Sequence, residues 1–223
     1  MPALPTDYDS DPDRWGSRDP GWRLAADVHE LVAARVAAQR LRPVLDVGSG
    51  RGRLRELLPT GWPWVGIDSS PNQLREEQSQ VVVLGDGNHL PFPHGVFGAV
   101  AALYMLYHLD DPTTAIAEAR RVLAPAGLFF ACTRARTSDP ELTDGYPPTT
   151  FDAEEAPDLV ASVFGEDAIE VVSWDGPLLR LPDGEAIRRY LRTHYLPADI
   201  AERVTPPLTL TKRGCLVVAG KVT

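Results

Sequence analysis

Two aspartates in the first half of the chain have a spacing that suits a nucleoside. Asp68 ends an apolar run 20 residues after Gly48, and Asp86 follows 18 residues after Asp68. A carboxylate at this distance from a glycine turn reaches a ribose, and its oxygens can accept hydrogen bonds from both vicinal hydroxyls. Asp86 is placed to accept a hydrogen bond from the exocyclic amine of an adenine, beside the backbone N–H groups of Gly87 and Asn88. The pair predicts a site for an adenosine-containing molecule.

A glycine-rich segment, Val44-Leu45-Asp46-Val47-Gly48-Ser49-Gly50-Arg51-Gly52, precedes these aspartates. Its alternate glycines allow a sharp turn and a close approach of the backbone to a ligand. The helix that follows attracts an anionic group to its N-terminus. Asp46 is interpreted mainly as an organiser of this loop through hydrogen bonds to backbone N–H groups. Arg53 stands where a Gly-x-Gly-x-x-Gly pyrophosphate loop has its third glycine, so the segment disfavours NAD.

Apolar runs and helix-periodic segments alternate between residues 24 and 132, which is typical of a parallel sheet covered by helices. Because parallel strands end at one edge of their sheet, the aspartates that end strands are expected to face a common crevice. The predicted fold class is therefore α/β. Expected strands are 43–47, 64–67, 81–84, 97–103, 128–132, 168–174 and 214–221, and expected helices are 24–39, 51–58, one from 71, 112–123, 153–164 and 183–194.

Three of these segments carry more detailed expectations. The continuous apolar run at 81–84 predicts a strand that is buried on both faces. The helix at 24–39 is predicted from apolar residues at helical spacing, which are Leu24, Val28, Leu31, Val32 and Val36. The polar, proline-containing stretch 133–150 predicts a surface loop that can act as a lid.

Composition limits the class of protein and of partner. With 223 residues the chain is the size of one domain, and its formal net charge of −9 disfavours a broad electrostatic grip on nucleic acid. There is no apolar run of 18 residues and no basic-then-apolar N-terminus, so we expect a soluble, cytoplasmic protein without a membrane partner. Cys132 and Cys215 lie in apolar runs and predict buried, reduced thiols, and no metal site is expected. A small-molecule partner is favoured, and the sequence indicates no oligomeric state.

The motifs that carry a family resemblance are Val44–Gly52, Gly66–Ser70, Gly85–Pro93, Leu103–Leu109 and Arg120–Gly127. In this order they resemble class I S-adenosylmethionine-dependent methyltransferases, in particular the small-molecule, type 11-like branch. The resemblance implies a Rossmann-like, doubly wound, seven-stranded sheet, mostly parallel with an antiparallel last strand. It also implies a single methyltransferase domain over 1–223. That domain would comprise an N-terminal cap or arm (1–23), a cofactor-binding core (24–132), and a loop, helices and C-terminal strands (133–223).

S-adenosylmethionine is the cofactor that the resemblance implies. Glycines of the loop would line its methionine end, Asp68 its ribose, Asp86 and Gly87 its adenine, and Leu103 its methionyl arm. The predicted cofactor-binding set is Asp46, Gly48, Ser49, Gly50, Asp68, Ser69, Asp86, Gly87, Asn88 and Leu103.

Methyl transfer from a sulfonium is an in-line displacement, so the protein mainly aligns donor and acceptor, which contributes about 7–11 kcal/mol. His108, five residues beyond Leu103, is the candidate general base, with a structural role at the next helix start as the alternative. Tyr104 and Tyr107 are candidates for the acceptor side, with packing against the sheet as the alternative. The remaining histidines, interpreted as ordinary solvent or packing residues, are His29, His89, His94 and His194.

Two further groups of residues allow a functional interpretation beside a structural one. Arg134 and Arg136 are interpreted as part of a solvated loop, with the binding of an acidic acceptor as the alternative. Tyr8, Trp15 and Trp22 are candidates for a cap that folds over the cleft and excludes water.

The preferred function is methyl transfer to a small organic acceptor. The alternatives are an RNA methyltransferase, which the negative charge disfavours, a cofactor-binding module without catalysis, and more distantly a nicotinamide oxidoreductase. The chain departs from the family pattern at Gly98, where an aspartate is common, and at Ala126, where a glycine is common. Both departures are interpreted as tolerated changes outside the cofactor contacts.

Overall fold

The computed structural model describes residues 11, 20–75 and 81–221, and within them seven strands form one sheet in the order β3-β2-β1-β4-β5-β7-β6. Strands β1 to β5 pair in parallel, whereas β7 is antiparallel to both of its neighbours. This topology confirms the predicted α/β sheet with an antiparallel last strand. The strands are β1 (Val44–Val47), β2 (Trp64–Asp68), β3 (Val81–Leu84), β4 (Phe97–Leu103), β5 (Leu123–Arg134), β6 (Ile169–Leu181) and β7 (Leu208–Gly220).

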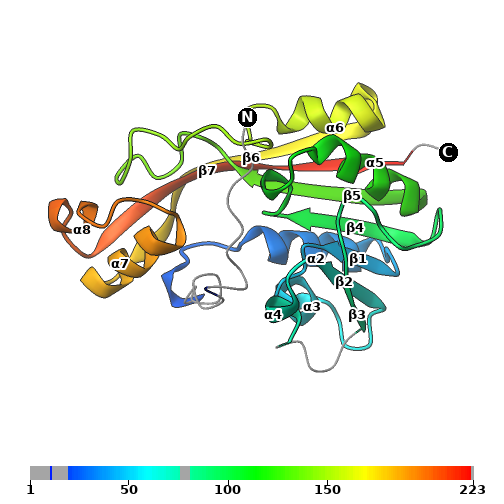
Figure 1. Cartoon of the computed structure of the whole chain (residues 1–223), viewed down its shortest axis with the longest axis horizontal. Coiled ribbons are helices and arrows are strands. Elements are labelled where there is room, and N and C mark those ends of the chain that lie inside the picture. Colours follow the sequence, from blue (N-terminus) through cyan, green and yellow to red (C-terminus); the bar gives the residue numbers. More distant parts are fainter. Residues whose placement is uncertain (1–10, 12–19, 76–80, 222–223) are drawn as a thin grey trace.

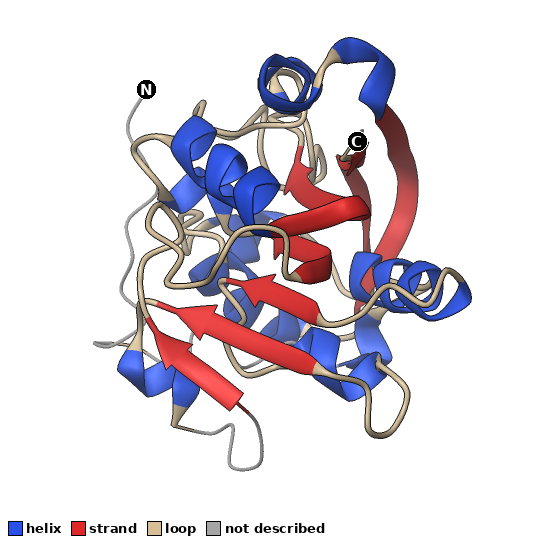
Figure 2. Ribbon diagram, turned by 90° about the vertical axis from the view of Figure 1, so that its right-hand side faces the viewer, coloured by secondary structure: helices blue, strands red, loops and turns tan. Residues whose placement is uncertain are grey.

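Helices cover both faces of the sheet, as Figures 1 and 2 show. One apolar cluster joins α5 and α6 to the sheet, and a second joins α2 and α3 to the opposite face. A third lies between α7, α8 and the far ends of β6 and β7. The α-helices are α2 (Val28–Ala38), α3 (Arg53–Leu57), α4 (Pro71–Leu74), α5 (Pro112–Val122), α6 (Ala156–Phe164), α7 (Gly184–Thr193) and α8 (Ile200–Arg203), and the 3₁₀ turns are η1 (Pro20–Trp22), η2 (Leu106–His108) and η3 (Glu166–Ala168).

The strand order places a topological switch point at β1. This strand lies between β2 and β4, so the connections that follow β1 and β3 lead to opposite sides of it. In open α/β sheets a crevice forms beyond the carboxyl ends of the strands at such a point, and ligands bind there. The loops after β1, β2, β3 and β4 are therefore the ones that can build a site.

Helix α2 begins at Val28, later than the predicted helix at 24–39. Asp27 caps it: the Asp27 carboxylate accepts a hydrogen bond from the Glu30 amide at 3.1 Å, and the Glu30 carboxylate accepts one from the Asp27 amide at 3.2 Å. This reciprocal capping box fixes the first turn. Leu24 precedes the helix and is 52% exposed, and Leu31 is 46% exposed, whereas the three valines at the same helical spacing are buried.

Strand β3 forms an edge of the sheet. Val81 and Leu84 are 64% and 61% exposed, so the prediction that the run at 81–84 is buried on both faces was wrong. The physical reason is its position, because an edge strand has only one neighbour, here β2, and the described helices pack over the more central strands. A continuous apolar run indicates a strand of a parallel sheet but does not indicate its place in the order.

Strands β6 and β7 have 13 residues each and extend past the other strands toward α7 and α8, as Figure 1 shows. The segment from Ala135 to α6 packs against this extension, with backbone hydrogen bonds from Ala135 to Arg213 at 2.9 Å and from Asp139 to Thr211 at 2.9 Å. Several of its residues are buried, so it is not the solvated surface loop predicted for 133–150. The buried residues are Ser138, Asp139, Leu142, Tyr146, Thr149, Phe151 and Asp152.

The structure shows the local backbone at Gly98 and Ala126, the two departures from the family pattern. A Cβ on Gly98 would lie 2.5 Å from the backbone nitrogen of Arg42, so no side chain fits at this position. Ala126 has φ of 60°, a left-handed conformation that glycine adopts at lower cost.

Both cysteines are free and buried, as predicted. Burial, with a smaller contribution from Glu154, raises the pKa of the Cys215 thiol to about 11. No helix in residues 11, 20–75 and 81–221 has the length and apolar character needed to cross a bilayer.

Candidate active site

A cavity of about 220 Å³ lies beyond the carboxyl ends of β1 to β4, and we call it the glycine-loop cavity. The structure brings to it most of the residues predicted for the cofactor, together with Tyr104 and His108. Its lining residues are Gly48, Gly50, Ile67, Asp68, Ser69, Gln73, Gly85, Asp86, Gly87, Tyr104, Met105, His108 and Leu109. The predicted residues outside this lining are Asp46, Ser49, Asn88, Leu103 and Tyr107.

Asp68 links the glycine loop to the start of α4. One of its carboxylate oxygens accepts a hydrogen bond from the Gly50 amide at 2.8 Å, and the other accepts one from the Ser70 amide at 2.9 Å. Ser70 itself caps α4 by accepting a hydrogen bond from the Gln73 amide. An ionised carboxylate offers about four acceptor positions, so these two bonds are compatible with binding ribose hydroxyls.

The glycine loop turns sharply and leaves open space beside Gly50. Gly48, Gly50 and Gly52 have φ values of 67°, 52° and 74°, which confirms the predicted sharp turn. A Cβ on Gly50 would meet only Gln73 Oε1, at 3.8 Å, so any side chain at this position would take up room in the cavity. With the carboxylates of the neighbouring strand ends, this space fits the predicted cofactor.

Gly48 packs so closely against Met105 that a side chain at this position would collide with it. A Cβ here would lie 2.7 Å from Met105 Cβ and 2.8 Å from Met105 Cγ, besides the unfavourable positive φ. We expect Gly48→Ala to lower the free energy of unfolding by about 1–2 kcal/mol and to weaken cofactor binding, because Met105 must leave its place in the cavity wall. Urea unfolding and calorimetry with S-adenosylhomocysteine measure the two effects. Unchanged stability would contradict the close contact.

Asp86 is exposed and organises the turn after β3. Its carboxylate accepts a hydrogen bond from the Asn88 amide at 2.9 Å and lies 3.2 Å from His89 Nδ1. Gly87 lies close to Val47 and Met105, at 3.2 and 3.5 Å from where a Cβ would be. The adenine role of Asp86 stays a prediction, and its position at the cavity rim is the one that role requires.

Asp46 is 4% exposed and sits in β1 behind the glycine loop. Burial is the main reason that its pKa is raised to about 7, and the nearby Asp68 carboxylate acts in the same direction. Its carboxyl group is therefore largely protonated below neutral pH. Asp46 therefore lies behind the loop, and both its role as an organiser of the loop and its part in cofactor binding stay predictions.

The raised pKa of Asp46 makes stability depend on pH. Between its ordinary pKa near 4 and about 7, the folded chain holds a proton that the unfolded chain has lost, so stability falls as pH rises. We expect this carboxyl group to lower the free energy of unfolding by about 2 kcal/mol between pH 5 and pH 7, and we expect Asp46→Asn to remove that part of the fall. Urea unfolding of both proteins at the two pH values provides the measurement. Parallel pH profiles would contradict the prediction.

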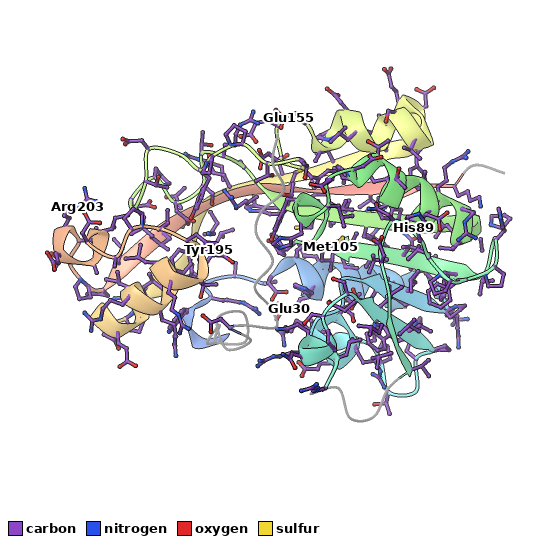
Figure 3. All side chains as sticks on the ribbon, viewed as in Figure 1. Glu30, His89, Met105, Glu155, Tyr195 and Arg203 are labelled. Carbon is purple, nitrogen blue, oxygen red and sulfur yellow. The ribbon has the colours of Figure 1, made fainter. Side chains whose placement is uncertain are left out.

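A second cavity, of about 350 Å³, shares Tyr104 with the glycine-loop cavity, and we call it the aromatic cavity. Met105 of the first cavity and Tyr195 of the second are labelled in Figure 3 and both lie toward the middle of the molecule. The lining combines tyrosines, tryptophans, leucines and basic side chains: Trp22, Arg23, Ala25, Ala26, Asp27, Val28, His29, Leu31, Tyr104, Tyr107, Arg134, Tyr146, Pro147, Trp174, Leu178, Leu179, Tyr190, Thr193, His194, Tyr195, Leu196, Lys212 and Arg213.

A buried polar cluster supports one wall of the aromatic cavity. Asp139 is fully buried and accepts hydrogen bonds from the hydroxyls of Tyr146 at 2.6 Å and Tyr190 at 2.8 Å. The Lys212 ammonium lies 2.7 Å from the Asp139 carboxylate and also contacts the Tyr190 hydroxyl. Burial and the Asp139 charge raise the pKa of Tyr146, which keeps its hydroxyl protonated as a donor. The cluster thus fixes the orientation of two aromatic rings.

His29 is a residue of this site that the sequence interpretation missed. It lies on α2, its ring centroid is 6.3 Å from that of Tyr104, and its Nδ1 is 3.6 Å from the Asp27 carboxylate. The only signal in the sequence was the pair Asp27 and His29, two residues apart at a helix start. Of the predicted cap, Trp22 lines the aromatic cavity, whereas Tyr8 and Trp15 lie outside the described residues.

Comparisons with known proteins agree with this geometry. The family model described as a methyltransferase domain matches residues 45–131. The ubiquinone/menaquinone biosynthesis C-methyltransferase UbiE of Desulfotalea psychrophila is 31% identical over 143 residues, which cover 60% of this chain and 54% of that protein. The chain spans about half the length of the curated relatives it matches. By these comparisons, residues 45–131 are similar to a methyltransferase domain.

Solved structures show the same fold at low sequence identity. The [4+2]-cyclase SpnF aligns with a TM-score of 0.66 and 18% identity, covering 100% of this chain and 99% of that chain. The plantazolicin methyltransferase BpumL, solved with a triazolic desmethylPZN analog and SAH, aligns with a TM-score of 0.58 and 11% identity over 87% of this chain and 83% of that chain. At these identities the likeness supports the fold alone.

Proposed function

We propose that this chain is an S-adenosylmethionine-dependent methyltransferase that acts on a small organic acceptor. The observation that carries the proposal is that the two cavities meet at Tyr104. One is built from the glycine loop and strand-end carboxylates that suit a nucleoside, and the other from aromatic and aliphatic side chains that suit an organic molecule. A donor site that adjoins an acceptor site is the arrangement that direct group transfer requires.

When bound, S-adenosylmethionine supplies a methyl group on a positively charged sulfur. Asp68 and Asp86 would bind its ribose and adenine, and the glycine loop its amino-acid end. Tyr104 has φ of 58° at the end of β4 and lies between the two cavities, where it can orient the acceptor. Residues in sparsely populated backbone conformations cluster at functional sites. The aromatic walls would exclude water from the part of the acceptor that they cover.

A proton acceptor is needed if the methyl group goes to a hydroxyl, and two histidines are placed near Tyr104. His108 lies on η2 and lines the glycine-loop cavity, and it remains the predicted general base. Its alternative role at the helix start is less needed, because Asp111 already caps α5 by accepting hydrogen bonds from the Thr113 and Thr114 amides. His29 lines the acceptor side.

Calorimetry with S-adenosylhomocysteine tests the donor half of the proposal, and we expect saturable binding well below 1 mM with one site per chain. Incubation of the protein with a metabolite extract and a methyl-labelled donor tests the acceptor half. Mass spectrometry should then find a small molecule that gains the label. Binding without any labelled product would favour a cofactor-binding module without catalysis, and absence of binding would reject the proposal.

A further inference from the structure

We propose that the aromatic cavity selects a planar, aromatic acceptor that carries a carboxylate, and that Arg134 binds this carboxylate. The identity of this molecule as the methyl acceptor rests on the proposed function. The binding site itself does not, and it can be tested without methyl transfer. The proposal follows from the aromatic composition of the wall, from the charge of the lining and from the partners of each basic side chain.

The wall is unusually rich in one kind of aromatic residue. Five of the six tyrosines of the chain line this cavity, with Trp22 and Trp174, whereas none of the six phenylalanines, all in the described part of the chain, does so. Tyrosine and tryptophan combine a flat apolar face with a polar end. A wall of this kind suits a ligand that has a flat apolar body and polar substituents.

The charge of the lining is opposite to that of the chain. The formal net charge is −9, yet among the described residues that line the cavity four are arginine or lysine and one is acidic. Three of the four basic side chains have a carboxylate partner. Arg23 pairs with Asp27, the Lys212 ammonium lies 2.7 Å from Asp139, and the Arg213 guanidinium lies 3.0 Å from Asp175.

Arg134 is the exception within the described residues. Its Nη1 is buried and has no hydrogen-bond partner there, and its guanidinium has no carboxylate within ion-pair distance. The guanidinium stacks on the Tyr146 ring at 3.8 Å from the ring centroid. A buried donor of a charged group that lacks a partner destabilises the protein, and an anionic ligand in the cavity would remove that cost.

The surroundings hold Arg134 in place for such a ligand. It is the last residue of β5, pairs with Gly214 of β7, and its carbonyl accepts a hydrogen bond from the Ala153 amide at 3.0 Å. The Tyr146 ring beneath the guanidinium is itself fixed by the hydrogen bond of its hydroxyl to Asp139. A planar guanidinium binds a carboxylate with two parallel hydrogen bonds, which a neutral group cannot reproduce.

The test compares a charged and a neutral probe of the same shape, 2-naphthoate and 2-naphthamide, by calorimetry at pH 7. We expect the wild-type protein to bind 2-naphthoate at least ~10-fold more tightly than 2-naphthamide. Arg134→Gln should remove this preference, and Arg134→Lys, which keeps the charge without the planar fork, should retain part of it. Arg213→Gln is the matched control, since Arg213 lines the same cavity but has Asp175 as its partner.

Equal affinity of the two probes for the wild-type protein, or no binding of either below 1 mM, overturns the proposal without any variant. A preference that survives in Arg134→Gln, or that Arg213→Gln removes equally, also overturns it. Calorimetry with S-adenosylhomocysteine on the same proteins separates this result from the proposed function. A probe preference without S-adenosylhomocysteine binding would retain the anion site and reject the methyltransferase, and the reverse outcome would reject only the anion site.

Discussion

Asp68→Ala is expected to weaken the binding of S-adenosylhomocysteine about 100-fold or more. The carboxylate lines the glycine-loop cavity and anchors the Gly50 amide at 2.8 Å, so its removal deletes the ribose acceptors and also releases the loop. A hydrogen bond to a charged group contributes about 1.5–3 kcal/mol, and two such bonds to ribose hydroxyls account for the predicted loss. Isothermal titration calorimetry measures it directly.

Two further variants serve as comparisons for the loss of affinity expected of Asp68→Ala. Asp86→Ala removes an exposed carboxylate at the rim of the same cavity, and we expect a smaller loss of about 10-fold. Asp158→Ala removes an exposed carboxylate of α6 that lines neither cavity, and it should leave affinity unchanged. Thermal unfolding of each variant shows whether the fold is kept. A folded Asp68→Ala protein that binds as tightly as the wild type would reject the ribose role of Asp68.

The glycine-loop cavity was predictable from the sequence because its parts are local. A glycine turn and an aspartate at a strand end each lie next to an element whose direction is readable, and the parallel sheet brings such ends together. Leu103 shows the limit of this reasoning. Alternate residues of a strand face opposite sides, and Leu103 packs with Ala99 and Ala101 in the cluster on the α2 side rather than in the cavity lining.

The aromatic cavity could not be predicted because its residues come from distant elements. His29 lies on α2, Arg134 ends β5, Tyr190 lies on α7 and Lys212 on β7. The long β6–β7 extension brings them together, and nothing in the spacing of these residues encodes that extension. Arg134 was interpreted as part of a solvated loop, with the binding of an acidic acceptor as the alternative, and in the structure it lies in the wall of the aromatic cavity with a buried Nη1.

Asp139→Asn is expected to lower the free energy of unfolding by about 3–5 kcal/mol, the usual cost of breaking a buried ion pair by removing one charge. The carboxylate is fully buried and holds the Lys212 ammonium together with the hydroxyls of Tyr146 and Tyr190. Asparagine keeps the shape but leaves the ammonium without its counter-charge. Urea unfolding at pH 7 gives the value, and Asp175→Asn, whose carboxylate is 66% exposed beside Arg213, should cost less than about 1 kcal/mol.

The ion pair of Asp139 and Lys212 makes the free energy of unfolding depend on pH with a sign opposite to that of the effect of Asp46. Burial alone would raise the pKa of Asp139, but the Lys212 ammonium and the hydrogen bonds outweigh it and hold the pKa below its ordinary value. A lowered pKa means that the unfolded chain takes up protons first, so this stabilisation is complete above about pH 4 and is lost as pH falls further. The stability difference between the wild type and Asp139→Asn should therefore be constant from pH 5 to pH 7 and shrink below pH 4. A difference that grows on acidification would show that Asp139 does not carry its charge in the folded protein.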